Sequence, residues 1–186
     1  IYNVGILLED QELIDFAMQA GPGVLEQAYI VEEGTWANGV DVGGKRMDDK
    51  DWWVYNELDQ FAMTFALQDE DIAAYLPETT DYFFQYFVDH EYGEIWTMVD
   101  GKTNQPKAGS LPKAWPWKSA YHSFEHAMIG YITGAQLAGE QVTLYYAFDG
   151  AVDAVNPYFF QGDIVSQEVI PAAEFDVVKV VFENIK

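Results

Sequence analysis

The change in residue pattern near residue 140 is the feature that most constrains the fold. Before it, apolar residues recur at helical spacing, most clearly over 51–67, where one stripe comprises Val54, Leu58, Phe61, Ala62 and Phe65. After Gly139 the chain turns to short β-rich segments, namely Val142–Phe148, Tyr158–Phe160, Ile164–Ile170 and Phe175–Ile185. We therefore expect a mainly helical part over residues 1–139 and a small β-rich annex over 140–186.

Four further segments before residue 140 have helical patterns, at 10–30, 69–75, 80–88 and 119–137. Gly21-Pro22-Gly23 is expected to split or kink the first of them, and Asp51 is placed to cap the helix that follows it. Residues 34–50 indicate a loop or hairpin. A long connection runs from His90 to Trp117 and contains one candidate strand at Ile95–Val99. Connections of this length with little regular structure are often functional loops.

The composition excludes several classes of protein. The net charge of −22 argues against nucleic acids and anionic membranes as partners, because both select basic surfaces. The chain has no cysteine, so it forms no disulfide, and no apolar run approaches the length that spans a bilayer. Ile1 stands where an initiator Met would, and no signal peptide follows it, which indicates a piece of a longer chain or a processed one.

The segment Trp115–Met128 carries the most chemistry. His122, Glu125 and His126 share one helix face there, and aromatic residues and Lys118 lead into it, which suggests a lined pocket. A histidine titrates near neutrality and moves protons at physiological pH. The face has three interpretations: a merely hydrogen-bonded surface, an H-x-x-E-H zinc peptidase motif, or a sugar-binding or proton-transfer helix. The zinc motif needs a third protein ligand, and the sequence after His126 is mostly strand and loop. We therefore expect no metal and no cofactor.

Aromatic residues are abundant, with 6 Trp, 12 Tyr and 12 Phe. Their rings stack on the apolar faces of sugars, and they also build large cores, so we expect both uses. Trp52 and Trp53 are adjacent on a helix, where neighbours point about 100° apart. One of the two is therefore expected in the core.

Four segments together resemble a known family. They are Asp51-Trp52-Trp53-Val54-Tyr55-Asn56-Glu57, Asp89-His90-Glu91-Tyr92-Gly93-Glu94 leading to Trp96, Trp117-Lys118, and Tyr121-His122. In this order and spacing they resemble the N-acylglucosamine 2-epimerase and cellobiose 2-epimerase superfamily, over roughly residues 6–137. That family has a K-x-W-W-x-x-x-E helix, a D-x-E-Y-G-x-W-F hairpin and a W-K-x-x-Y-H helix entry. The resemblance implies that residues 1–139 are the C-terminal helices of an (α/α)6 barrel.

The resemblance also implies a reaction. The family interconverts sugars that differ at carbon 2, or isomerises aldose and ketose, by proton transfer at carbon 2 of a ring-opened sugar. Two histidines on opposite sides of the barrel exchange the proton, and His122 matches the later one. The substrate is expected to be a neutral mono- or disaccharide. The residues that match its surroundings are Trp52 and Trp53 as an aromatic platform, Glu57 as an inward carboxylate, and Lys118, Tyr121, Glu125 and His126 as further binding or orienting groups.

This sequence also departs from the family. The earlier histidine lies on a helix N-terminal to anything in this chain, and His126 cannot replace it because it is on the same helix as His122. Ser123 and Glu125 stand where many members have Asn and a nearby Arg. A partial barrel would expose an apolar flank, so a protein partner on that flank or on the β-rich annex is expected. The alternative to an enzyme is thus a non-catalytic sugar-binding or scaffold subunit. The resemblance favours a soluble, cytoplasmic protein.

Overall fold

A computed structural model describes residues 1–148 and 154–186. The chain divides into two compact units, one formed by Ile1–Met18 with Gly130–Lys186 and the other by Gln19–Ile129. Each unit is described by itself. Within the described residues no helix is long and apolar enough to cross a membrane.

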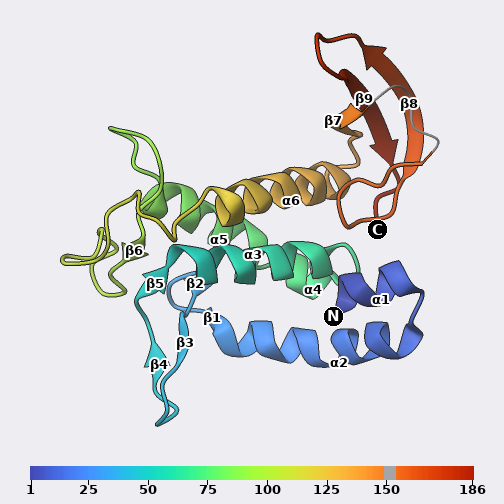
Figure 1. The fold of residues 1–186 in the computed structure, drawn as a ribbon. Coiled ribbons are helices and arrows are strands. Elements are labelled where there is room, and N and C mark those ends of the chain that lie inside the picture. The colour runs from blue at the N-terminus through green and yellow to red at the C-terminus, as the bar shows by residue number, and fades with distance from the viewer. Residues whose placement is uncertain (149–153) are drawn as a thin grey trace. The chain divides into compact units, whose positions relative to one another are not determined.

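The helix α3 (Trp52–Ala66) is the centre of the unit Gln19–Ile129. The short strand β5 (Lys50–Asp51) leads directly into it and pairs antiparallel with β6 (Met98–Val99), as Figure 1 shows. The N–H of Trp52 continues this pairing to the carbonyl of Thr97 at 3.0 Å. Asp51 occupies the N-cap position as expected, but its side chain makes no cap hydrogen bond. The start of α3 is therefore fixed by strand pairing to a segment about 45 residues later.

The buried face of α3 differs from the stripe that hydrophobic periodicity predicts. Val54, Leu58 and Phe61 are only half-buried, whereas Tyr55, Asn56 and Asp59 are fully buried. Hydrogen bonds explain two of these buried polar groups. The Tyr55 hydroxyl donates to the carbonyl of Thr79 at 2.7 Å, and the indole N–H of Trp36 donates to Asp59 at 2.7 Å. Partnered polar groups can be buried, and periodicity of apolar residues does not detect them.

The remaining elements of this unit surround α3. They are β1 (Tyr29–Ile30) paired with β2 (Thr35–Trp36), the hairpin of β3 (Gly39–Val40) and β4 (Arg46–Met47), α4 (Glu70–Ala73), α5 (Leu76–Tyr82), and the π-helical turn η1 (Phe83–Phe87). The predicted hairpin within 34–50 is confirmed. The predicted strand 95–99 is reduced to β6, and Ile95 makes only an isolated bridge with Val88. Tyr55, Tyr82, Phe83 and Phe87 form the aromatic centre of the core.

The helix α2 (Gln11–Ala28) runs through Pro22 as one helix, so of the two expectations for Gly21-Pro22-Gly23, a split or a kink, the split is wrong. Gly21 has a packing role instead. A Cβ at this position would lie 2.6 Å from the Phe65 ring, so only glycine allows α2 and α3 to approach this closely.

The other unit contains α1 (Tyr2–Leu8), which the sequence pattern did not predict, and a three-stranded antiparallel sheet. Its strands are β7 (Val142–Phe148), β8 (Asp163–Ile170) and β9 (Asp176–Glu183), in the order β7-β9-β8. Three predicted β segments are confirmed, whereas Tyr158–Phe160 lies in turns. Val142, Val178, Val180 and Phe182 are fully buried, and every residue of the edge strand β8 is exposed.

α6 (Tyr121–Leu137) begins two residues later than the predicted helix 119–137 and ends with it, shortly before Gly139, whose φ is 71°. Its buried face includes two polar side chains. Phe124 is 74% exposed, whereas Glu125 and His126 are buried together with Ile129 and Ile132. The described part of the chain is thus mainly helical with small β-sheets. The (α/α)6 barrel and the boundary between residues 139 and 140 stay predictions.

Candidate functional site

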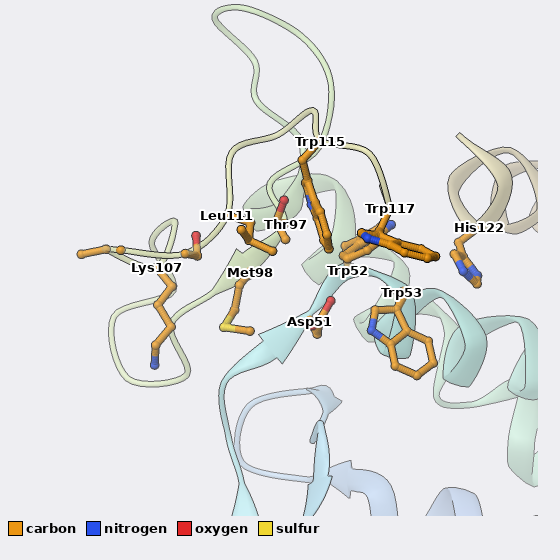
Figure 2. Close-up of a pocket in the computed structure, with 13 residues that line it drawn as sticks. Asp51, Trp52, Trp53, Thr97, Met98, Lys107, Leu111, Trp115, Trp117 and His122 are labelled. Carbon is orange, nitrogen blue, oxygen red and sulfur yellow. The ribbon is translucent and has the colours of Figure 1, made fainter. Parts of the chain in front are cut away.

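A pocket of about 690 Å³ lies at the start of α3, within the unit Gln19–Ile129. Its lining comes from α3 and its N-cap, from the strand and loop around β6, and from α6, as Figure 2 shows. The lining residues are Asp51, Trp52, Trp53, Thr97, Met98, Lys107, Ala108, Gly109, Ser110, Leu111, Trp115, Trp117 and His122. This volume falls within the range that accommodates small-molecule ligands.

Four tryptophans line the pocket, and they differ in burial. Trp52 is 5% exposed, and its ring meets that of Trp115 edge-on at 6.3 Å between centroids. Trp53 is 44% exposed and Trp117 is 82% exposed. The prediction that one member of the Trp52–Trp53 pair is a core residue is confirmed for Trp52. Both nevertheless reach the pocket, because they occupy the first turn of α3 and the end of the helix borders the pocket.

His122 and Glu57 form the polar edge of this aromatic lining. The Nδ1 atom of His122 lies 2.8 Å from Oε1 of Glu57, and the imidazole lies about 6 Å from the rings of Trp52 and Trp53. A carboxylate accepts only, so Nδ1 carries the proton in this contact. The neutral ring then has its lone pair on Nε2, and no described side chain hydrogen-bonds that atom. His122 is thereby oriented as a proton acceptor at the pocket.

Asp51 lines the same pocket with a partly buried carboxyl group. Burial raises the pKa of Asp51, and the nearby N–H groups of Trp53 and Trp52 oppose this shift only in part. Within the described chain, its Oδ1 atom is buried without a hydrogen-bond partner. The sequence had suggested only a helix cap at this position.

Lys118 was predicted to bind substrate, but its side chain is turned inward. Its Nζ donates to Glu94 Oε1 at 3.1 Å and to the carbonyls of Ile95 and Lys113 at 2.7 and 2.6 Å. Three contacts account for the three N–H donors of an ammonium group. Burial lowers the pKa of Lys118, and Glu94 opposes the shift. Lys118 thus holds the ends of the 95–118 loop together and does not line the pocket.

Lys113 forms a second clamp in this loop. It is paired with Asp89, and its ammonium group also donates to the carbonyl of Gly93 at 2.9 Å. The ammonium lies 4.7 Å from the centre of the Trp96 ring. The Asp89–Trp96 segment therefore packs as a loop anchor, and it presents no lining residue to the pocket.

His126 and Glu125 are buried beside the pocket and do not line it. The Nε2 atom of His126 lies 2.8 Å from Oδ2 of Asp59, whose other oxygen accepts the indole N–H of Trp36. The His126 ring also packs on Phe83 at 4.5 Å between centroids. Glu125 accepts a hydrogen bond from the hydroxyl of Tyr121 at 3.2 Å. The contact between His126 and Asp59 joins α6 to α3, and the contact between Tyr121 and Glu125 lies within α6, so both residues are placed to support the helix that carries His122.

The contacts give the zinc interpretation no support. His122 and His126 contact different carboxylates, Glu57 and Asp59. Across residues 1–148 and 154–186, no group of three or more His, Cys, Asp and Glu side chains is arranged to hold a metal ion.

The structure therefore brings His122, Trp52, Trp53 and Glu57 together at the pocket. Lys118, Glu125 and His126 do not line it. Tyr121 precedes His122 on α6 and is 59% exposed. Sequence reasoning pointed to the aromatic residues at 115–117 as part of a lined pocket but missed the pocket residues 107–111. The length of this connection and its tryptophans were the available signals, but spacing alone does not show where a loop folds back.

Comparisons with known proteins test the resemblance. No family model matches the sequence, and no curated protein does. Among solved structures, cellobiose 2-epimerase from Bacillus thermoamylovorans B4167 is similar, with a TM-score of 0.55 and 22% identity. The match covers 65% of this chain and 31% of that protein, so the chain spans about a third of its length. The likeness shows that the matched part of this chain has a fold similar to the corresponding part of that protein.

Proposed function

We propose that this pocket is part of the active site of a sugar 2-epimerase or aldose–ketose isomerase that acts on a neutral mono- or disaccharide. The observation that carries the proposal is the orientation of His122. Glu57 holds Nδ1, and Nε2 remains as the basic atom of an imidazole that lines a tryptophan-rich pocket.

The chemistry follows from that orientation. In a ring-opened sugar, the hydrogen on the carbon next to the carbonyl is the acidic one, and a base within hydrogen-bond reach removes it. His122 Nε2 accepts this proton, and the Glu57 carboxylate stabilises the imidazolium that forms. Returning the proton to the same carbon, or to its neighbour, completes epimerisation or isomerisation. The face from which the proton returns decides the stereochemistry.

The tryptophans suit such a substrate. Sugar rings present apolar C–H faces that pack on indole rings, and Trp53 and Trp117 expose large ring surfaces at the pocket. The likeness to cellobiose 2-epimerase in fold supports the same class of ligand. We place the helices 1–139 in an (α/α)6 barrel as part of this proposal.

A second candidate is a non-catalytic sugar-binding or scaffold subunit, for which His126 provides the argument. His126 is only 3% exposed and is held by Asp59, so it supplies no second base. In this version, the sugar binds at the tryptophans, and a protein partner docks on the exposed strand β8 or on the exposed face of α6.

Hydrogen exchange at carbon 2 distinguishes the candidates, because a single base is enough to remove the proton. The protein is incubated in D₂O with cellobiose, glucose or mannose, and deuterium at carbon 2 is followed by NMR. We expect exchange in the wild type and its loss in His122→Asn. His90→Asn is the matched control, since His90 is exposed and, among the described residues, hydrogen-bonds the carbonyl of Phe84. Sugar binding without exchange in the wild type would favour the non-catalytic candidate.

A further inference from the structure

Three buried polar atoms without a hydrogen-bond partner gather at one place in the described chain. They are Asp51 Oδ1, Trp52 Nε1 and Trp115 Nε1, and all three residues line the same pocket. A buried polar atom without a partner loses its hydration and gains nothing in return. Such atoms are rare in folded proteins, so three beside one pocket call for a ligand that pairs with them.

The three atoms are chemically complementary to a hydroxylated ligand. A carboxylate oxygen only accepts a hydrogen bond, and an indole N–H only donates one. A sugar hydroxyl does both, so adjacent hydroxyls satisfy an acceptor and two donors together. An anionic ligand would be repelled by Asp51, and an apolar ligand would leave all three atoms unpaired.

The backbone holds Asp51 and Trp52 in place before any ligand binds. Asp51 pairs with Met98 in the β5–β6 ladder, and its N–H donates to the side chain of Asn38 at 3.2 Å. The N–H of Trp52 is fixed to Thr97. Trp115 lies on the loop and is anchored by an isolated bridge to Lys118. A ligand would therefore contact Asp51 and Trp52, which the strand pairing holds in place, and Trp115, which lies on a loop.

We propose that Asp51 is a specificity-determining residue of this pocket. Its carboxylate accepts a hydrogen bond from a hydroxyl of a neutral saccharide, and the indole N–H groups of Trp52 and Trp115 donate to oxygen atoms of the same ligand. The class of ligand rests on the proposed function, whereas the role of Asp51 in binding does not require catalysis. All three atoms are buried from solvent. In this proposal the loop segment that carries Trp115 moves aside to let the ligand reach them. Burial of the Asp51 carboxyl, which raises its pKa, is consistent with a group that lacks an ionic partner.

The test measures cellobiose binding by calorimetry, together with the indole N–H resonances of the protein. We expect Asp51→Asn and Asp51→Ala to weaken binding roughly 10- to 100-fold, the usual effect of a hydrogen bond to a charged group. Asp48→Asn is the matched control. Asp48 is a nearby carboxylate that pairs with Arg46 at the surface and does not line the pocket. Asn is a good N-cap residue, so Asp51→Asn is expected to fold.

The wild-type resonances give a readout that does not depend on any variant. Two of the six tryptophan indole N–H signals, those of Trp52 and Trp115, should move downfield when cellobiose binds. Unchanged affinity in both Asp51 variants, or unmoved signals for these two tryptophans, would overturn the proposal. Absence of any binding by cellobiose, glucose and mannose would overturn it as well.

These results separate the proposal from the proposed function. Asp51-dependent binding without hydrogen exchange at carbon 2 would support the role of Asp51 in binding and exclude the proposed epimerase activity. Hydrogen exchange that persists in both Asp51 variants, with unaltered affinity for the sugar, would support the proposed epimerase activity and exclude the role of Asp51 in binding.

Discussion

The imidazole of His122 on α6 is joined to the carboxylate of Glu57 on α3 by a contact of 2.8 Å between residues 65 apart in sequence. This contact fixes which ring nitrogen carries the proton. It also sets the imidazole at the edge of a pocket that four tryptophans help to line. The candidate chemistry of this protein depends on that one pair.

Glu57→Gln tests the orienting role of the carboxylate. An amide presents either an acceptor or a donor to Nδ1 and no longer stabilises the imidazolium, so we expect hydrogen exchange at carbon 2 to fall about 10-fold or more. The free energy of unfolding should change by less than about 1 kcal/mol, because Glu57 is half-exposed. Glu26→Gln, on the same unit, is the control. An exchange rate equal to that of the wild type would contradict the role of Glu57.

Substitutions of Trp52 and Trp53 should have different effects, one mainly on stability and the other mainly on sugar binding. Trp53→Ala removes an exposed ring, and we expect cellobiose affinity to fall by roughly 1–2 kcal/mol with little loss of stability. Trp52→Ala removes a buried ring and should lower the free energy of unfolding by about 3–5 kcal/mol. Chemical denaturation and calorimetry measure the two effects. If Trp53→Ala destabilised the fold as much as Trp52→Ala, the platform assignment would be wrong.

His126→Ala tests the buried contact with Asp59. The substitution leaves a cavity and removes one of the two partners of a fully buried carboxylate, so we expect a loss of about 2–5 kcal/mol in the free energy of unfolding. His90→Ala, which removes an exposed histidine, should cost far less. Equal stability of the two variants in urea denaturation would exclude an anchoring role for His126.

The pairing of Asp89 with Lys113 predicts a dependence of stability on pH. The hydrogen bond from Lys113 holds the pKa of Asp89 below its ordinary value of 3.8. The unfolded chain therefore binds the proton first as pH falls. The stabilisation by this pair is present above about pH 4 and is lost as pH drops through the lower folded-state pKa.

Denaturation curves between pH 2 and pH 7 measure this effect. Asp89→Asn should be less stable than the wild type at neutral pH, and the difference should shrink toward pH 2. Asp15→Asn removes the same charge from an exposed helix position whose carboxylate contacts Gln11, and it serves as the control. A constant difference between wild type and Asp89→Asn at every pH would refute the linkage.

The sequence by itself determined the helices and strands that have a regular pattern. Helical spacing placed α3 and α6 within about two residues of their ends, and the β-rich composition of the segments after Gly139 placed β7, β8 and β9. The motif around Trp52, Trp53, Glu57 and His122 also pointed to residues that lie together at one site.

Only the tertiary structure decided which face of each helix is buried and which polar groups have partners. The buried side of α6 carries Glu125 and His126 because each has a hydrogen-bond partner, Tyr121 on the same helix and Asp59 on α3, and apolar periodicity cannot register such bonds. Lys118 faced inward for the same reason, since the carbonyls of Ile95 and Lys113 come together only when the loop folds. Asp51 became a pocket residue because the pairing of β5 with β6 set it beside a loop about 60 residues later. Contacts between distant segments depend on how the whole chain packs, whereas the pattern within one segment does not.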